Sequence, residues 1–119
     1  MRRMSFMLTE PQFVDGSKTV TRRLGWLFLK PGDRLLAVNK CQGLRPGEKA
    51  RILGTIEVVD VRRELLHDIT PDDCVREGFS HLTPLGFVQM FTKHMDCTAG
   101  TQVTRIEFKR VQASEQEAL

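Results

Sequence analysis

The sequence has few of the residues that mark disulfide-rich, metal-binding or membrane proteins. Its three cysteines, Cys41, Cys74 and Cys97, are an odd number, lie far apart and form no CxxC pair. We therefore expect no disulfide framework, and a reducing cytoplasm as the compartment. The most apolar run, 24–29, is far too short to span a bilayer, and no apolar signal-peptide core follows the basic start of the chain. A membrane is not an expected partner.

Internal repeats, low-complexity segments and linkers are absent as well. We expect one domain over residues 1–111, which is long enough to form a single hydrophobic core without stabilising disulfides or a structural metal. The polar segment 112–119 has little to bury, and we expect a frayed tail there. The net charge is +3. This charge mildly favours polyanionic or phosphate-bearing partners, but it falls short of a strongly basic nucleic-acid-binding domain.

Turn residues and β-branched runs predict a strand-rich α+β fold. We expect strands over 5–8, 19–23, 34–40, 52–61 and 101–111. Pro-Gly turns at 30–33 and 45–48 precede two of them, and Gly54 is expected at a bulge. In the last strand Ile106 and Phe108 alternate with Arg105 and Glu107, which predicts one buried and one exposed face. The turns favour closure into a small, strongly bent β-barrel of about five to six strands with short inserted helices.

Three short helices are predicted from their start and stop residues. Thr9 and Gly16 bracket the first helix, which has a proline in its first turn. Thr70 and Gly78 bracket the second, and Thr83 begins the third. The third helix carries an apolar stripe, interpreted as a core face rather than a cofactor site. The stripe consists of Phe87, Val88, Phe91 and Met95.

The segment 16–23 has the densest cluster of cationic and hydroxyl side chains in the sequence. Lys18 is expected at the junction of a loop and a strand, outside the core, while Thr21 and Arg23 share one face of that strand. Together they would line a polar pocket for an anion or a polar base edge, because Arg offers paired planar donors and Lys a point charge. The alternative is a solvated basic strand edge.

Glu77 ends the second helix, directly before Gly78. A carboxylate at the negative end of the helix dipole costs a few tenths of a kcal/mol, roughly, so local stability disfavours it. This favours a role as general acid or base. The alternative is an exposed glutamate paired with Arg76 or another surface cation.

Four further residues were considered as candidates. His94 and Cys97 form an HxxC pair, but no second pair completes a tetrahedral site, so no metal is expected. Cys97 could act as a nucleophile with His94 as base, or it could be a buried structural cysteine. Trp26 could stack on a base or pack at the edge of the core. Lys40 could add charge to the same cleft or face solvent.

Taken in order, these motifs resemble the ASCH domain family. The GxKxxTxR pattern falls on Gly16, Lys18, Thr21 and Arg23, and the resemblance extends over about 4–111. It implies a PUA-like β-barrel with a cleft for RNA or modified nucleosides. One branch of the family hydrolyses the amide of N-acetylated cytidine with the motif lysine, the motif threonine and a later glutamate, which fall on Lys18, Thr21 and Glu77. Other ASCH proteins look like RNA-binding modules or ribonucleases.

Two classes of function follow, neither with a cofactor. In an amidohydrolase, the Thr21 hydroxyl or a water attacks the amide carbonyl, Lys18 is base or oxyanion partner, and Glu77 carries the proton. In an RNA-binding module, cationic side chains hold phosphate and an aromatic ring stacks on a base. The ligand-binding residues expected are Arg22, Arg23, Trp26 and Lys40. A pocket that encloses Lys18, Thr21 and Glu77 within hydrogen-bond reach would favour the enzyme.

Overall fold

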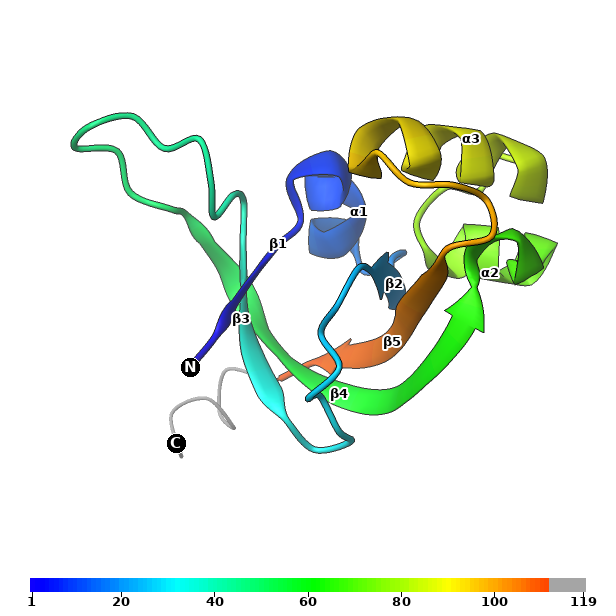
Figure 1. The fold of residues 1–119 in the computed structure, drawn as a ribbon. Coiled ribbons are helices and arrows are strands. Elements are labelled where there is room, and N and C mark those ends of the chain that lie inside the picture. Colours follow the sequence, from blue (N-terminus) through cyan, green and yellow to red (C-terminus); the bar gives the residue numbers. More distant parts are fainter. Residues whose placement is uncertain (112–119) are drawn as a thin grey trace.

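A computed structural model describes residues 1–111 of the chain, so the tail expected at 112–119 lies outside the described residues. Five strands form one sheet, and three short α-helices accompany it (Figure 1). The strands are β1 (Arg3–Ser5), β2 (Val20–Arg23), β3 (Arg34–Val38), β4 (Ile52–Leu65) and β5 (Gln102–Arg110). The helices are α1 (Glu10–Asp15), α2 (Pro71–Arg76) and α3 (Pro84–Met95), with 3₁₀ turns η1 (Met7–Thr9) and η2 (Leu66–Asp68). None of these helices is long and apolar enough to cross a membrane.

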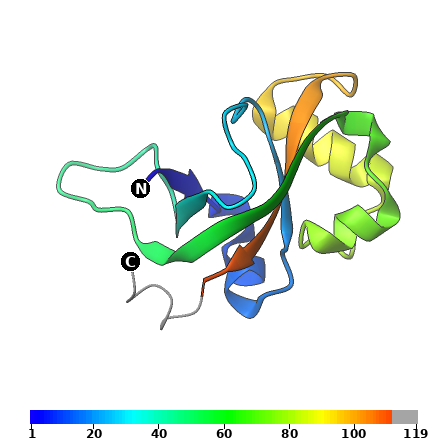
Figure 2. The ribbon, with the colours of Figure 1, turned by 90° about the horizontal axis from the view of Figure 1, so that it is seen from below.

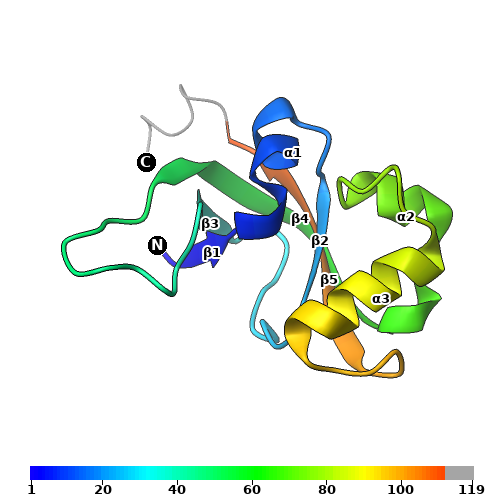
Figure 3. The same ribbon diagram turned by 90° about the horizontal axis from the view of Figure 1, so that it is seen from above.

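The sheet is mixed and strongly curled, with the strand order β1-β3-β4-β5-β2. β1 runs parallel to β3, and the other neighbouring pairs are antiparallel. The closed barrel predicted from the turns is not formed by the described residues, because β1 and β2 are the two edges of the sheet and do not pair. These edge strands have only three and four residues. α1 instead lies across the mouth of the curled sheet (Figures 1 and 3).

Two register shifts accompany the curl of β4, the longest strand of the sheet. One lies beside Gly54, where Ala37 pairs with Gly54 and Val38 with Ile52, so the bulge predicted near Gly54 is confirmed. The other lies between Val58 and Asp60. Figure 2 shows β4 bending across the whole domain alongside β5. The strand continues to Leu65, four residues beyond its predicted end.

The predicted helix ends are largely confirmed. Thr70 and Thr83 cap α2 and α3, accepting hydrogen bonds from backbone N–H groups at 3.2 and 3.1 Å. Gly16 ends α1 with a φ of +84°, the left-handed conformation that glycine adopts without strain. Thr9 precedes α1, but its side chain makes no capping bond. The strand predicted over 5–8 was wrong, since the chain pairs at Arg3–Ser5 and then forms η1.

Two hydrophobic clusters stabilise the domain. The first lies between α1 and the curled sheet, and comprises Met4, Phe6, Phe13, Leu29, Leu35, Ala37, Ile56, Val58, Ile106 and Phe108. The second lies where α2 and α3 cover the ends of β4 and β5, and comprises Leu66, Ile69, Cys74, Phe87, Val88, Phe91 and Val103. The stripe predicted on α3 is thus a core face, except that Met95 is 39% exposed.

β5 departs from the half-buried pattern that its alternation predicted. Ile106 is fully buried on the predicted core face, but Arg105 on the opposite face is also only 4% exposed. Asp73 of α2 lies on that face and pairs with Arg105 at 2.6 Å. The middle of β5 is therefore buried on both sides, and one side is ionic.

Ile106→Val should lower the free energy of unfolding by about 0.5–1.5 kcal/mol, because it deletes one buried methylene and leaves a small void. Lys109→Ala, at a position of the same strand that is exposed, should change it by less than about 0.5 kcal/mol. Urea unfolding of both variants measures the difference. Equal effects would show that the buried face of β5 was assigned incorrectly.

Candidate functional site

Lys18 and Glu77 meet where β2 begins and α2 ends. The backbone brings them together, since Lys18 N donates to Gln12 O at 3.1 Å and Thr19 N donates to Arg76 O at 2.8 Å. Lys18 Nζ then donates to Glu77 Oε1 at 2.7 Å and to the Glu77 carbonyl oxygen at 2.9 Å. Both side chains are almost fully buried, at 2% and 3% exposed. The predicted position of Lys18 outside the core was therefore wrong.

Gly78 allows this close approach of α2 to α1. Its φ is +92°, and a Cβ atom at this position would lie 2.8 Å from Gln12 Cβ and 3.4 Å from Lys18 Cβ. Any other residue at this position would therefore have a strained backbone, and its Cβ atom would clash with the Gln12 side chain. The glycine that the sequence indicated as a helix stop also makes room for the Lys18–Glu77 pair.

Arg22 extends the pair into a buried ionic network. Its guanidinium donates to Glu77 Oε2 at 3.2 Å, to Glu64 Oε1 at 2.5 Å and to Asp73 Oδ2 at 2.5 Å. Arg105 donates to both Asp73 oxygens, at 2.6 and 3.0 Å. Strands β2, β4 and β5 are thereby tied to α2 through hydrogen-bonded charges.

The electrostatics of this cluster differ from one group to the next. Burial lowers the pKa of Lys18, although the Glu77 carboxylate acts in the opposite direction. Hydrogen bonds from Arg105, with those from Arg22, hold the pKa of Asp73 well below its usual range. Burial also lowers the pKa of Arg23, to about 10. A group with a pKa of about 10 remains cationic at neutral pH.

Thr21 and Arg23 lie beside the ionic network. Arg23 Nε donates to Thr21 Oγ1 at 3.0 Å, and the Arg23 guanidinium lies 5.0 Å from the centre of the Phe6 ring. Because the Thr21 oxygen accepts this bond, its own proton is free to be donated. Within residues 1–111 Arg23 forms no ion pair with a carboxylate. Its positive charge is therefore left uncompensated by a direct partner.

A pocket of about 210 Å³, here called the Lys18 pocket, opens between the two hydrophobic clusters. One end is polar and is lined by Lys18, Thr21, Arg22, Arg23 and Glu77. The other end is mainly apolar, with Phe79, Phe87, Met90 and Phe91 among its lining residues. This combination suits a flat, partly apolar ligand with a polar group to be bound or attacked.

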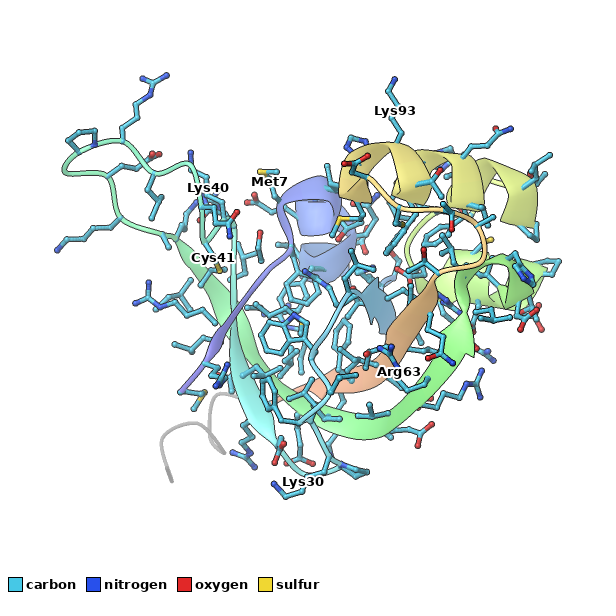
Figure 4. The ribbon with its side chains drawn as sticks, viewed as in Figure 1. Met7, Lys30, Lys40, Cys41, Arg63 and Lys93 are labelled. Atoms are coloured by element: carbon cyan, nitrogen blue, oxygen red, sulfur yellow. The ribbon has the colours of Figure 1, made fainter. Side chains whose placement is uncertain are left out.

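A second pocket, of about 380 Å³ and here called the Lys40 pocket, adjoins the first. Arg3, Trp26, Lys40, Cys41 and Gln42 line it, together with Ser5, Met7, Arg23 and Met95, which line both pockets. Figure 4 shows Lys40 and Cys41 at the end of β3 that faces Met7. Trp26 also packs against the first hydrophobic cluster, so both roles considered for it are compatible with the structure.

The predicted site residues thus fall into two adjoining groups. Lys18, Thr21 and Glu77 line one pocket with Arg22 and Arg23, whereas Trp26 and Lys40 line the next. The exposed Glu77–Arg76 pair considered as an alternative is not formed. Arg76 instead donates to Asp73 at 3.1 Å.

Sequence reasoning missed three members of the ionic network, Glu64, Asp73 and Arg105. Asp73, in the first turn of α2, has an ordinary explanation as an acid that complements the helix dipole, and Glu64 lies beyond the predicted end of its strand. Arg105 had been assigned to the exposed face of β5. The one available indication that β4 continues to Glu64 was the lack of any glycine, proline or other turn residue between Val61 and Leu65.

His94 and Cys97 do not form a common site. His94 lines the Lys18 pocket, whereas Cys97 packs against the second hydrophobic cluster. Across residues 1–111, no group of three or more His, Cys, Asp or Glu side chains is arranged to hold a metal ion.

No family model and no curated protein matches the sequence. Among solved structures, the fold is similar to an ASCH domain from Lactobacillus crispatus JV V101, with a TM-score of 0.71 and 13% identity over 92% of this chain and 78% of that chain. It is also similar to a protein of the DUF984 family from Enterococcus faecalis V583, with a TM-score of 0.61 and 14% identity over 87% and 70% of the two chains. A mutant ASCH protein from Zymomonas mobilis has a TM-score of 0.54 and 13% identity, over 98% and 77%.

These similarities define an α+β fold of the ASCH type. The resemblance inferred from the GxKxxTxR pattern is therefore confirmed at the level of the fold. Three residues of that pattern, Lys18, Thr21 and Arg23, are among the residues that line the Lys18 pocket, as is Glu77.

Proposed function

We propose that this chain binds a modified nucleoside in the Lys18 pocket and hydrolyses the amide of an N-acylated cytidine. The observation that carries the proposal is the enclosure of Lys18, Thr21 and Glu77 in one pocket, with Lys18 and Glu77 joined at 2.7 Å. An open basic groove with a distant Glu77 would have favoured simple binding. A buried lysine–glutamate pair beside a hydroxyl is instead a typical arrangement for moving protons.

The proposed reaction begins at the amide carbonyl carbon. The Thr21 oxygen, or a water in its place, forms the new C–O bond while the attacking hydroxyl proton passes to the neutral amine of Lys18. Burial makes this neutral form more accessible, because it lowers the lysine pKa. The Arg23 guanidinium, which already donates to Thr21, is placed to stabilise the oxyanion.

Collapse of the tetrahedral intermediate breaks the C–N bond. The departing exocyclic amine of cytidine takes its proton from the Lys18–Glu77 pair, since these two groups share a short hydrogen bond. If Thr21 is the nucleophile, the product is an acyl ester on Thr21. Water then hydrolyses this ester to the free carboxylic acid, with the same pair accepting and returning the proton.

A second candidate is a non-catalytic RNA-binding module or a ribonuclease. The observation that favours RNA is the Lys40 pocket, whose lining includes Arg3, Arg23, Lys40 and the indole of Trp26. Cationic side chains with an adjacent aromatic ring are common in single-stranded RNA sites.

Assays on the purified chain separate these candidates. Mass spectrometry should show loss of the acyl group from N-acetylcytidine or a related N-acylated cytidine. Short single-stranded RNA is tested in parallel, by gel for cleavage and by titration at several salt concentrations for binding. Salt-sensitive RNA binding with no deacylation of any acylated cytidine would overturn the amidohydrolase proposal, and RNA cleavage would favour the ribonuclease.

Thr21→Val should reduce turnover of the acylated cytidine by about 10²-fold or more, because it removes the hydroxyl while keeping the side-chain shape. Thr21→Ser is the matched control, since it keeps the hydroxyl and should retain most turnover. Steady-state deacylation rates of both variants provide the measurement. Full activity in Thr21→Val would assign the attack to water and remove Thr21 from the reaction.

A further inference from the structure

The two pockets adjoin each other and share part of their lining. Arg23, Met7 and Met95 line both of them, and Figure 4 shows Met7 facing the loop that carries Lys40 and Cys41. A base held in the Lys18 pocket could therefore have its sugar directed toward the Lys40 pocket. The chemistry of that second pocket indicates what could be attached to the sugar.

The charge balance of the two pockets differs. In the Lys18 pocket, Glu77 lines the wall and pairs with the cations beside it. The Lys40 pocket is lined by three cations, Arg3, Arg23 and Lys40, and by no carboxylate of residues 1–111. Lys40 does contact a carboxylate, Glu48 at 3.3 Å, but that side chain is 36% exposed and does not line the pocket. The pocket thus has an excess of positive charge.

Arg23 is the best-defined cation of this group. Its Nε donates to Thr21, and this is the one side-chain hydrogen bond that Arg23 forms within residues 1–111, so its two terminal nitrogens remain available to a ligand. The guanidinium lies over the Phe6 ring, 5.0 Å from its centre, which limits its movement. A planar guanidinium with two free donors matches a pair of phosphate oxygens.

Trp26 supplies a rigid apolar wall to the same pocket. Its φ of +53° is unusual for a residue with a large side chain, and its ring lies 5.6 Å from the Phe28 ring, centre to centre. Backbone held in such a conformation is commonly found at binding sites. An apolar wall in the same pocket as three cations suits a sugar phosphate better than a free inorganic anion.

We propose that the Lys40 pocket binds a phosphate group carried by the sugar of the ligand, so that the preferred ligand is a nucleotide rather than a free nucleoside. This inference rests on the proposed binding of a cytidine in the Lys18 pocket. Arg23 would contact the phosphate from between the two pockets, and Arg3 and Lys40 would contact it from the far side. The phosphate can be that of a mononucleotide or the first phosphodiester of an RNA.

The test compares affinities and needs no turnover. Calorimetric titration with cytidine, cytidine 5′-monophosphate, cytidine 3′-monophosphate and a cytidine-containing dinucleotide identifies the position and source of the phosphate. At least one phosphorylated ligand should bind about tenfold more tightly than cytidine or better, since charge-assisted hydrogen bonds contribute factors of this order. A preference for the monophosphates indicates a mononucleotide, and an equal or greater preference for the dinucleotide indicates RNA.

Two variants test which cations are responsible. In Lys40→Gln and in Arg3→Gln the preference for the phosphorylated ligand over cytidine should fall by about threefold to tenfold, and its dependence on salt should weaken. Lys30→Gln is the matched control, because Lys30 is exposed and lies in the turn at the far end of the domain (Figure 4). It should leave the preference as in the wild type.

Equal affinities for cytidine and all phosphorylated ligands would overturn the inference, and so would a preference that survives in both variants. These failures are distinct from failure of the proposed function. Deacylation of N-acetylcytidine without any preference for phosphorylated ligands would support the proposed amidohydrolase activity and overturn the phosphate site. A preference for phosphorylated ligands that depends on Lys40, without any deacylation, would support the phosphate site and overturn the proposed amidohydrolase activity.

Discussion

Asp73→Asn should lower the free energy of unfolding by about 3–5 kcal/mol, the usual cost of removing one partner from a buried ion pair. Asp73 is 3% exposed, and its carboxylate accepts hydrogen bonds from Arg22 and Arg105, both of which are also buried. The neutral amide would remove the carboxylate that Arg22 and Arg105 share, and it would turn an NH₂ group toward one of them. Arg105 would keep only a contact of 3.9 Å with Glu107, whereas Arg22 would keep Glu64 and Glu77. Chemical denaturation of the purified variant measures the loss.

Asp72→Asn is the matched control for that variant. Asp72 lies in the same first turn of α2 but is exposed, so its replacement removes only a favourable interaction with the helix dipole, worth about 1 kcal/mol or less. A loss in Asp73→Asn no larger than that in Asp72→Asn would contradict a stabilising role for the buried network.

The pH dependence of stability should distinguish the wild-type protein from Asp73→Asn. The folded-state pKa of Asp73 is lowered, so its contribution is fully present above the unfolded-state pKa of about 3.9 and is lost as the pH falls toward the folded value. Wild-type protein should therefore lose stability more steeply than Asp73→Asn as the pH is lowered below about 4. Parallel acid unfolding curves would show that Asp73 is not the group responsible.

Glu77→Gln should reduce turnover of an N-acylated cytidine by about 10²- to 10⁴-fold, the range for loss of a general acid or base. Glutamine keeps the size of the side chain and an oxygen that can accept from Lys18, but it cannot carry the proton between Lys18 and the leaving amine. The expected loss is in kcat, with a smaller change in KM, because the missing step occurs in the transition state. Steady-state kinetics on the folded variant provide the measurement.

Glu64→Gln separates this catalytic effect from simple loss of charge. Glu64 pairs with the same Arg22 as Glu77, but it does not line the Lys18 pocket. It should therefore cost stability while reducing turnover far less than Glu77→Gln. Equal losses of turnover in the two variants would mean that Glu77 acts only by positioning Arg22.

Local patterns in the sequence predicted the polar end of the pocket. The alternation of β2 placed Thr21 and Arg23 on one side, and the stop at Gly78 drew attention to Glu77. These inferences needed only neighbouring residues, and the structure brings all of them to one pocket. The ASCH-type fold followed from the same motifs.

The ionic network could not be predicted in this way, because it depends on how α2 packs across the sheet. Asp73 and Arg105 are 32 residues apart, and each has an ordinary local explanation, as a first-turn acid and as an outward-facing strand residue. Closure of the sheet was predicted incorrectly for a related reason. Turn residues report on local chain reversals, whereas closure requires that two distant edges meet, and here β1 and β2 remain apart.

Thr19, the residue between Lys18 and β2, is hydrogen-bonded on both sides of its backbone. Its N–H donates to the carbonyl of Arg76 in α2, and its carbonyl accepts from Phe108 N in β5 at 3.0 Å. Detaching α2 would break the first of these bonds. It would also separate Lys18 from Glu77 and Arg22 from Asp73, although Arg22 would keep Glu64 of β4. Such an opening should therefore be nearly as rare as complete unfolding. A ligand would then enter past the exposed thioethers of Met7 and Met95, which line both pockets, while Glu77, directly after α2, stays in place.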